Sequence, residues 1–76
     1  MGSPVTPSVV DSGQGVYKVF TFTSVGNGDT FVGPLGPVAY WANSEASTVG
    51  ANVAYSAGTY TFYVGGTGKL TLFVSL

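Results

Sequence analysis

The sequence predicts a small all-β protein, an antiparallel β-sandwich or barrel of about five to six short strands with an extended N-terminal arm. Three observations lead to this prediction. Several short stretches alternate apolar and polar residues with the two-residue period of a half-buried strand. Glycine-rich turn sequences separate these stretches. No part of the chain keeps a helical period over several turns, and 76 residues leave room for one compact domain.

The predicted arm comprises residues 1–15. Pro4 and Pro7 fix φ and lack an N–H donor, so this stretch is not expected inside a central strand. It is either a disordered tail or an arm that lies on a neighbouring subunit. Its apolar anchors would then be Val5, Val9 and Val10. The single β domain spans residues 16–76.

The first predicted strand is 16–25, with Phe20 and Phe22 on one face. The segment 26–29 follows and contains an Asn-Gly pair, both residues of which tolerate positive φ. It predicts a hairpin whose return strand begins at 30–32.

Two prolines and two glycines in 33–37 interrupt any ladder and predict a loop or a crossover between sheets. A short strand is expected at 38–42. The polar segment 43–48 predicts a loop with room for one helical turn, and 49–56 predicts another short strand.

The C-terminal part predicts a second hairpin with its turn at 65–68. The segment 59–64 places three apolar residues on one face, namely Tyr60, Phe62 and Val64. The strand 69–76 directs four residues inward, namely Leu70, Leu72, Val74 and Leu76. We expect this last strand to be an open edge with Lys69 as its only charge guard.

The size of the chain predicts that neighbours complete it. Apolar burial and conformational entropy nearly cancel in a domain this short, and such domains usually carry disulfides, a metal or a partner. The chain has no Cys and no His, and its three carboxylates, Asp11, Asp29 and Glu45, lack calcium-loop spacing. We therefore expect oligomerisation or docking, with a well-packed monomer as the alternative.

The charge content supports the same expectation. Charged residues make up 7% of the chain, against about 25% in ordinary soluble domains. A permanently covered surface explains this shortage, although a coat of Ser, Thr and Gly is an alternative. Two lysines without arginine do not predict a nucleic-acid partner. No apolar run approaches the ~18 residues of a membrane span.

The sequence predicts no catalytic residue, cofactor or metal ligand. Without His or Cys, the usual triads cannot form. Both positions three residues before a lysine hold glycine, so a Ser-x-x-Lys motif is also absent. Two carboxylates, Asp29 and Glu45, could in principle act as acid and base on a glycoside, but both fall in predicted loops and Asp29 is better explained as a turn residue.

Aromatic residues are more numerous than one small core requires, with 11 in 76 positions. Tyr and Trp are enriched at interfaces and in sugar-binding platforms. The candidate interface residues are Tyr40, Trp41, Tyr55, Tyr63 and Phe73, together with the three valines of the arm. Phe73 alternates away from the inward leucines, which predicts a second layer or a subunit contact. Partial burial is the alternative.

The runs 22–30 (FTSVGNGDT) and 58–64 (GTYTFYV), in a charge-poor chain rich in Gly, Thr and Val, resemble small structural proteins of tailed bacteriophages. The nearest class is the capsid decoration, or cement, proteins, and the resemblance covers residues 16–76. It implies a small β domain without cofactors, often trimeric, that binds a major capsid protein on the capsid surface. An N-terminal arm sometimes helps to lock neighbouring capsomers.

Three functions therefore remain open. The first is a virion structural protein, made in the host cytoplasm, since residues 1–14 lack a secretion signal. The second is a carbohydrate- or receptor-binding module, such as a fibre tip that stacks sugar rings on Trp41 and the tyrosines. The third is a subunit of a bacterial or synthetic assembly that grows by strand addition at the open edge.

Overall fold

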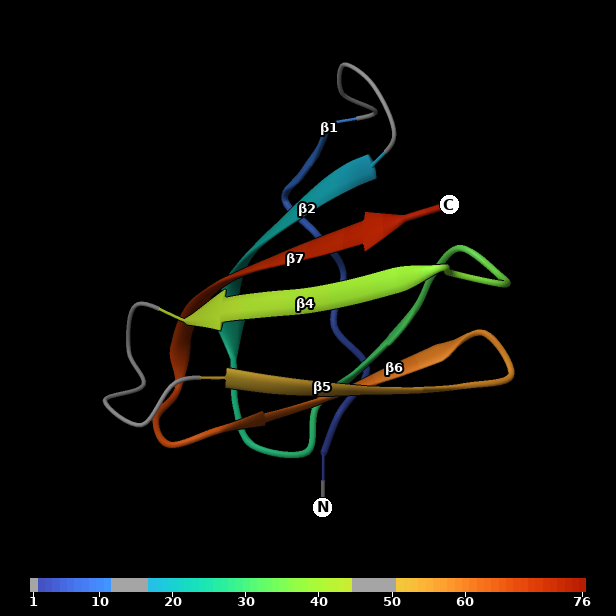
Figure 1. Ribbon diagram of the computed structural model, residues 1–76. Coiled ribbons are helices and arrows are strands. Elements are labelled where there is room, and N and C mark those ends of the chain that lie inside the picture. Colours follow the sequence, from blue (N-terminus) through green and yellow to red (C-terminus); the bar gives the residue numbers. More distant parts are fainter. Residues whose placement is uncertain (1, 12–16, 45–50) are drawn as a thin grey trace.

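The computed structural model describes residues 2–11, 17–44 and 51–76. Over these ranges the protein contains seven β-strands and no helix. The strands are β1 (Val9–Asp11), β2 (Tyr17–Val25), β3 (Thr30–Val32), β4 (Ala39–Ser44), β5 (Ala51–Ser56), β6 (Thr59–Val64) and β7 (Gly68–Ser75). They form two antiparallel sheets, consistent with a β-sandwich, which confirms the predicted all-β class (Figure 1).

The four-stranded sheet has the order β1-β2-β7-β4, and the three-stranded sheet has the order β3-β6-β5. The strand beyond the predicted number is β1, which lies in the segment assigned to the arm. The predicted strands at 38–42 and 49–56 correspond to β4 and β5.

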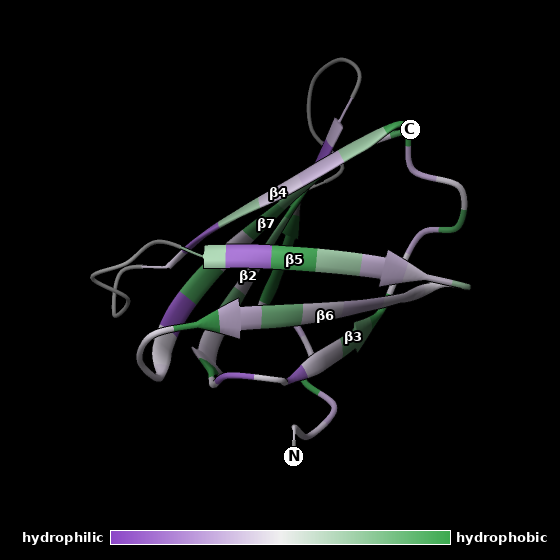
Figure 2. Ribbon diagram, turned by 60° about the horizontal axis from the view of Figure 1, so that its bottom comes forward, coloured by the Kyte–Doolittle hydropathy of each residue, from purple (hydrophilic) through white to green (hydrophobic). Residues whose placement is uncertain are grey.

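The core forms where the period-two alternation places it. The buried apolar residues include Phe20, Phe22, Tyr60, Phe62, Val64, Leu70, Leu72 and Val74. The rings of Phe22 and Phe62 lie 5.4 Å apart and join the two sheets across the middle of the molecule. Leu76 was predicted to point inward, but it is half exposed because β7 ends one residue before it. Figure 2 shows the two sheets facing each other, with hydrophobic residues along β7, β5 and β3.

Both predicted hairpins are wrong, because each turn passes from one sheet to the other. The turn 26–29 leads from β2 to β3, which pairs with β6 and not with β2. The turn 65–68 leads from β6 to β7 in the opposite sheet. The backbone at 26–29 is tied to β6, since Gly28 N donates to Phe62 O and Phe62 N donates to Asp29 O. These bonds carry the chain into the second sheet.

A tight hairpin joins β5 and β6, and its two-residue turn is Ala57-Gly58. Both residues have positive φ, 49° and 90°. This is the combination required by a type I′ turn, whose twist matches that of the flanking strands.

The last strand is not an open edge, contrary to the prediction. β7 lies between β2 and β4 and pairs with both along nearly its whole length. Its backbone N–H and C=O groups are therefore already hydrogen-bonded on both sides, so β7 cannot be the open edge that was predicted for strand addition. Lys69 lies in an internal strand rather than guarding an edge.

The segment 33–37 is a crossover from β3 to β4, as one of its two predicted interpretations requires. The first residues of the predicted polar loop, Asn43 and Ser44, belong to β4. The rest of that prediction, including Glu45, lies in 45–50, outside the described residues.

Residues 2–11, which we call the N-terminal strap, lie against the sandwich of their own chain. Pro4 forms a parallel bridge with Thr30 at the start of β3. Farther along, β1 pairs with the edge of β2. The prolines thus avoid the central strands, as predicted. The predicted boundary between arm and domain falls within 12–16, outside the described residues.

Candidate interaction surface

The most exposed large apolar side chains of the described residues lie in the crossover between the sheets or directly beside it in the sequence. Val32, Leu35 and Val38 are 76%, 74% and 79% exposed. The Val38 N–H donates to the Ser75 carbonyl, so the end of the crossover runs beside the end of β7 and the exposed Leu76. We call Val32, Leu35, Val38 and Leu76 the crossover patch. Figure 2 shows the crossover and the C-terminus on the same side of the molecule.

Hydrogen bonds from the core hold the crossover in place. The Tyr60 hydroxyl donates to the Pro34 carbonyl at 2.7 Å, and the Gly36 N–H donates to the Tyr55 hydroxyl at 3.1 Å. The Gly33 N–H donates to the Gly58 carbonyl at 3.0 Å. Because the loop is fixed at three points, Gly33, Pro34 and Gly36, its apolar side chains are presented in defined positions.

Tyr60 anchors this arrangement from within the core. Its side chain is fully buried, and its ring lies 4.9 Å from that of Tyr55 and 5.9 Å from that of Tyr40. Burial, with smaller effects from Tyr55 and Tyr40, raises the pKa of Tyr60 to about 12. The hydroxyl is therefore protonated at all ordinary pH values and acts as a donor to Pro34.

A second apolar group, the aromatic cluster, lies on the outer face of the four-stranded sheet and comprises Tyr17, Trp41 and Phe73. Trp41 and Phe73 are register partners on β4 and β7. Their rings are nearly parallel, at 8°, with centroids 5.2 Å apart. Two parallel rings with centroids this close cannot lie edge to edge in the same plane, because their atoms would clash. The rings therefore stack face to face with a lateral offset, and each covers one face of the other. Tyr17 closes the cluster, with its centroid 5.9 Å from that of Trp41.

The other predicted interface residues lie apart from this cluster. Tyr40 and Tyr55 pack on each other and on the core, with centroids 6.0 Å apart. Tyr63 is exposed on β6, in the other sheet. In the strap, Val5 packs partly against the core, whereas Val9 and Val10 are exposed.

The sequence predicted Trp41 and Phe73 as candidate interface residues but did not predict that they are neighbours. It did not point to Tyr17 or to the crossover patch. Tyr17 could have been found, because it shares its face with Thr21 and not with Phe20. Leu35, between Pro34 and Gly36, gave a weaker signal, since a crossover can bury or expose its side chain.

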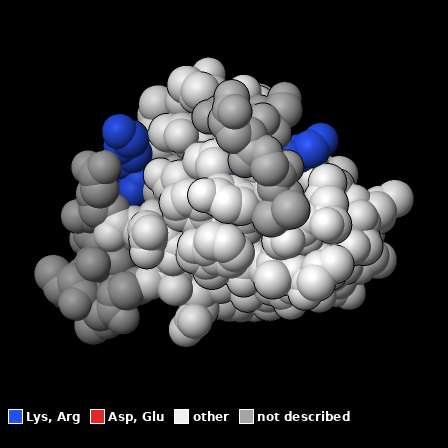
Figure 3. Space-filling view, turned by 45° about the horizontal axis from the view of Figure 1, so that its top comes forward, with Lys and Arg blue, Asp and Glu red and all other residues white. Residues whose placement is uncertain are grey.

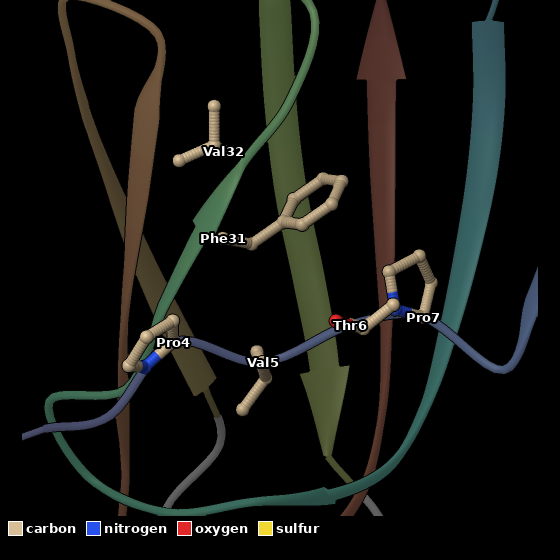
Figure 4. Close-up of a pocket in the computed structure, with 6 residues that line it drawn as sticks. All are labelled: Pro4, Val5, Thr6, Pro7, Phe31 and Val32. Carbon is tan, nitrogen blue, oxygen red and sulfur yellow. The ribbon is translucent and has the colours of Figure 1, made fainter.

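A shallow groove lies between the strap and β3. Its volume is about 300 Å³, and it is lined by Pro4, Val5, Thr6, Pro7, Phe31 and Val32. Figure 4 shows the strap running along one side of this groove, with the side chains of Phe31 and Val32 on the other. At Val32 the groove adjoins the crossover patch.

Asp29 has a structural place in the described residues. Its Oδ2 accepts from Gly26 N at 2.7 Å, and its Oδ1 accepts from Ser3 N at 2.9 Å. These two hydrogen bonds lower the pKa of Asp29 below its usual 3.8, the one from Ser3 contributing most. Its interpretation as a turn residue is confirmed, because the carboxylate closes the 26–29 turn and ties the strap to it.

Charge is sparse around these surfaces. In the part of the chain that the structure describes, no group of three or more His, Cys, Asp or Glu side chains is placed to hold a metal ion. Figure 3 shows a face on which the two lysines lie far apart, with neutral side chains between them. The described ranges also contain no helix long and apolar enough to cross a membrane.

The fold and its surface define the class of the protein, a small antiparallel β-sandwich with an apolar crossover. Searches of family models, of curated proteins and of solved structures each found no match.

Proposed function

We propose that this protein is a non-enzymatic structural subunit that assembles with copies of itself and with a larger protein surface. The crossover patch carries the proposal. Its three most exposed side chains lie in 30–44, a stretch without any charged residue, and the loop that presents them is fixed by hydrogen bonds. Exposed apolar surface that is both rigid and uncharged is typical of a site that another protein covers.

Burial of the patch supplies a modest driving force. Covering Val32, Leu35 and Val38 is worth roughly 4–8 kcal/mol at the usual value for each buried aliphatic side chain. Association entropy consumes much of this. A single contact is therefore weak, whereas a symmetric array that repeats it many times holds firmly.

The particular role that we propose is that of a capsid decoration, or cement, protein on a virion surface. Its partners would be its own copies, with a trimer favoured, and a major capsid protein. Support comes from the resemblance of 22–30 and 58–64 to the small structural proteins of tailed phages, and from the need for repeated weak contacts. The protein would be made in the host cytoplasm and would need no cofactor.

A carbohydrate-binding module is the second candidate, because Trp41 is 43% exposed beside Tyr17 and Phe73. The offset stack weighs against it, since a sugar ring needs a free aromatic face and Phe73 already covers one face of Trp41. A glycan array decides the matter. Binding that is lost in Trp41→Ala would favour the carbohydrate module.

Co-sedimentation with undecorated phage capsids tests the first proposal. The wild-type protein should bind with a fixed stoichiometry, and Leu35→Lys should bind at least ten times more weakly, because it places a charge in the contact. Tyr63→Lys, at an exposed position of β6 outside the crossover patch, is the matched control and should bind normally. Equal binding of both variants, or no binding of the wild type to any capsid, would contradict the proposal.

A further inference from the structure

The N-terminal strap closes two open sheet edges at once. On β3, the Val5 N–H donates to the Thr30 carbonyl at 2.7 Å, and the Thr30 N–H donates to the Ser3 carbonyl at 3.0 Å. On β2, the Ser8 N–H donates to the Thr21 carbonyl at 2.7 Å, and β1 continues the ladder. One segment thus passes from the edge of the three-stranded sheet to the edge of the four-stranded sheet.

Without the strap, β2 would be an uncovered edge strand that is prone to pair with other chains. It is nine residues long, and its sequence, YKVFTFTSV, is rich in β-branched and aromatic residues. Long apolar edges of this kind pair with other chains unless something covers them. The fold therefore needs a strap at this position, but it does not require the strap to come from the same chain.

The contacts that bind the strap are mostly independent of the chain that supplies it. They are chiefly backbone hydrogen bonds, with the Ser8 hydroxyl and the Asp29 carboxylate as side-chain additions. A strap from an identical neighbour would form the same bonds in the same register.

Closure within one chain leaves apolar surface unused. Val9 and Val10 are each 56% exposed, and the groove of about 300 Å³ between strap and β3 is open. Only Val5 of the strap valines packs partly against the core. The strap is therefore bound by its backbone more than by its side chains. A neighbouring copy of the protein that packed against the strap would cover the exposed Val9 and Val10.

We propose that in the assembly the strap of one copy pairs with β2 and β3 of a second copy. This strand exchange rests on the proposed function and names its mechanism. Residues 12–16 connect the strap to β2, so Asp11 and Tyr17 can lie at most about 20–22 Å apart. The recipient is therefore an adjacent copy. The exchanged bonds replace equivalent ones, so the exchange is governed by the high local concentration in the assembly.

Disulfide trapping between two single-cysteine variants tests the exchange, because the chain has no cysteine of its own. Val9 and Thr21 are register partners, and opposed residues of antiparallel strands have Cα atoms about 4.5–5.5 Å apart, within disulfide range. Val9→Cys and Thr21→Cys chains, carrying different tags, are refolded together, concentrated and oxidised. The control pairs Val9→Cys with Tyr63→Cys.

The exchange predicts a covalent heterodimer between the Val9→Cys and Thr21→Cys chains, at least five times more abundant than in the control pair. Equal yields in both pairs would overturn it. Sedimentation of the same unoxidised mixture separates the two proposals. An assembled protein without specific heterodimer leaves the structural role standing and refutes the exchange, whereas a monomer at every concentration refutes both.

Discussion

The hydroxyl of Tyr60 reaches out of the core and donates a hydrogen bond to the carbonyl of Pro34 at 2.7 Å. Through this bond, a fully buried aromatic residue of the sandwich fixes the loop that carries the exposed Leu35. Interior packing and the proposed contact surface are therefore coupled.

Tyr60→Phe should weaken this coupling without disturbing the packing of the ring. Loss of one partly buried hydrogen bond costs about 1 kcal/mol of unfolding free energy. Urea denaturation at neutral pH measures it. Tyr63→Phe is the control, since Tyr63 lies on the same strand, β6, but is exposed, and it should change stability by less than about 0.5 kcal/mol. Equal effects of the two variants would contradict the role of the Pro34 bond.

The raised pKa of Tyr60 predicts an alkaline limit to stability. Below the unfolded pKa near 10, both states are protonated and the contribution of Tyr60 is complete. As pH rises from about 10 towards the folded pKa of about 12, the unfolded state loses its proton first and stability falls. In Tyr60→Phe, the unfolding free energy should fall less steeply across this window. Parallel pH profiles for the two proteins would contradict this.

Asp29 predicts the opposite dependence at acid pH. Its pKa is lowered in the folded state by the Ser3 and Gly26 amides, so its contribution is present above the unfolded pKa and is lost as pH falls through the folded pKa. Asp29→Asn should cost about 1 kcal/mol at pH 7, and little once the carboxylate is protonated. Thermal melts against pH measure the difference. A cost that stays constant down to the lowest pH would mean that charge plays no part.

The turn Ala57-Gly58 offers a stabilising change. Ala57 has a φ of 49°, which strains a residue with a Cβ and suits asparagine better. Ala57→Asn should raise the unfolding free energy by about 0.5–1 kcal/mol. Gly58→Ala should lower it, because Gly58 has a φ of 90° and a Cβ there would lie 2.9 Å from Leu35 Cδ2. Chemical denaturation of both variants measures the two changes in unfolding free energy. Changes of the same sign would contradict the assignment of a type I′ turn at Ala57-Gly58.

The aromatic cluster should contribute to stability whether or not it binds a partner. Trp41→Ala removes the stack on Phe73 and part of the cover of the outer face, at a cost of about 1–2 kcal/mol. Tyr63→Ala, at a similarly exposed position on the other sheet, should cost less. Urea denaturation of the two variants would contradict this if their costs were equal.

Much of the fold could be predicted from the sequence because each strand is covered on one face only. Phe20 and Phe22, and later Leu70, Leu72 and Val74, therefore alternate with polar or exposed residues, and alternation is a local signal. The pairing of strands was not predictable in the same way. The Asn27-Gly28 pair marks a reversal, but a two-residue type I′ hairpin needs positive φ at both residues, and here Gly28 has it, at 86°, while Asn27 does not. Long-range bonds from Phe62 carry the chain into the other sheet.

The candidate surface was predictable to a smaller extent. Phe73 was expected to face outward from its alternation, and Trp41 joins it because register makes them partners on adjacent strands. Leu35 gave no such signal, since its exposure depends on where the Tyr60 and Tyr55 hydroxyls hold the crossover. Those contacts join residues far apart in the chain.

Sedimentation equilibrium over a dilution series, from high to low micromolar, tests the central claim most directly. The wild-type chain should associate reversibly as its concentration rises. A variant with Val32, Leu35 and Val38 all changed to Ser should remain a folded monomer throughout, because the surface that drives association has become polar. A wild-type protein that sediments as a monomer across the whole series, and still unfolds cooperatively at high temperature, would contradict the claim that neighbours complete this sandwich.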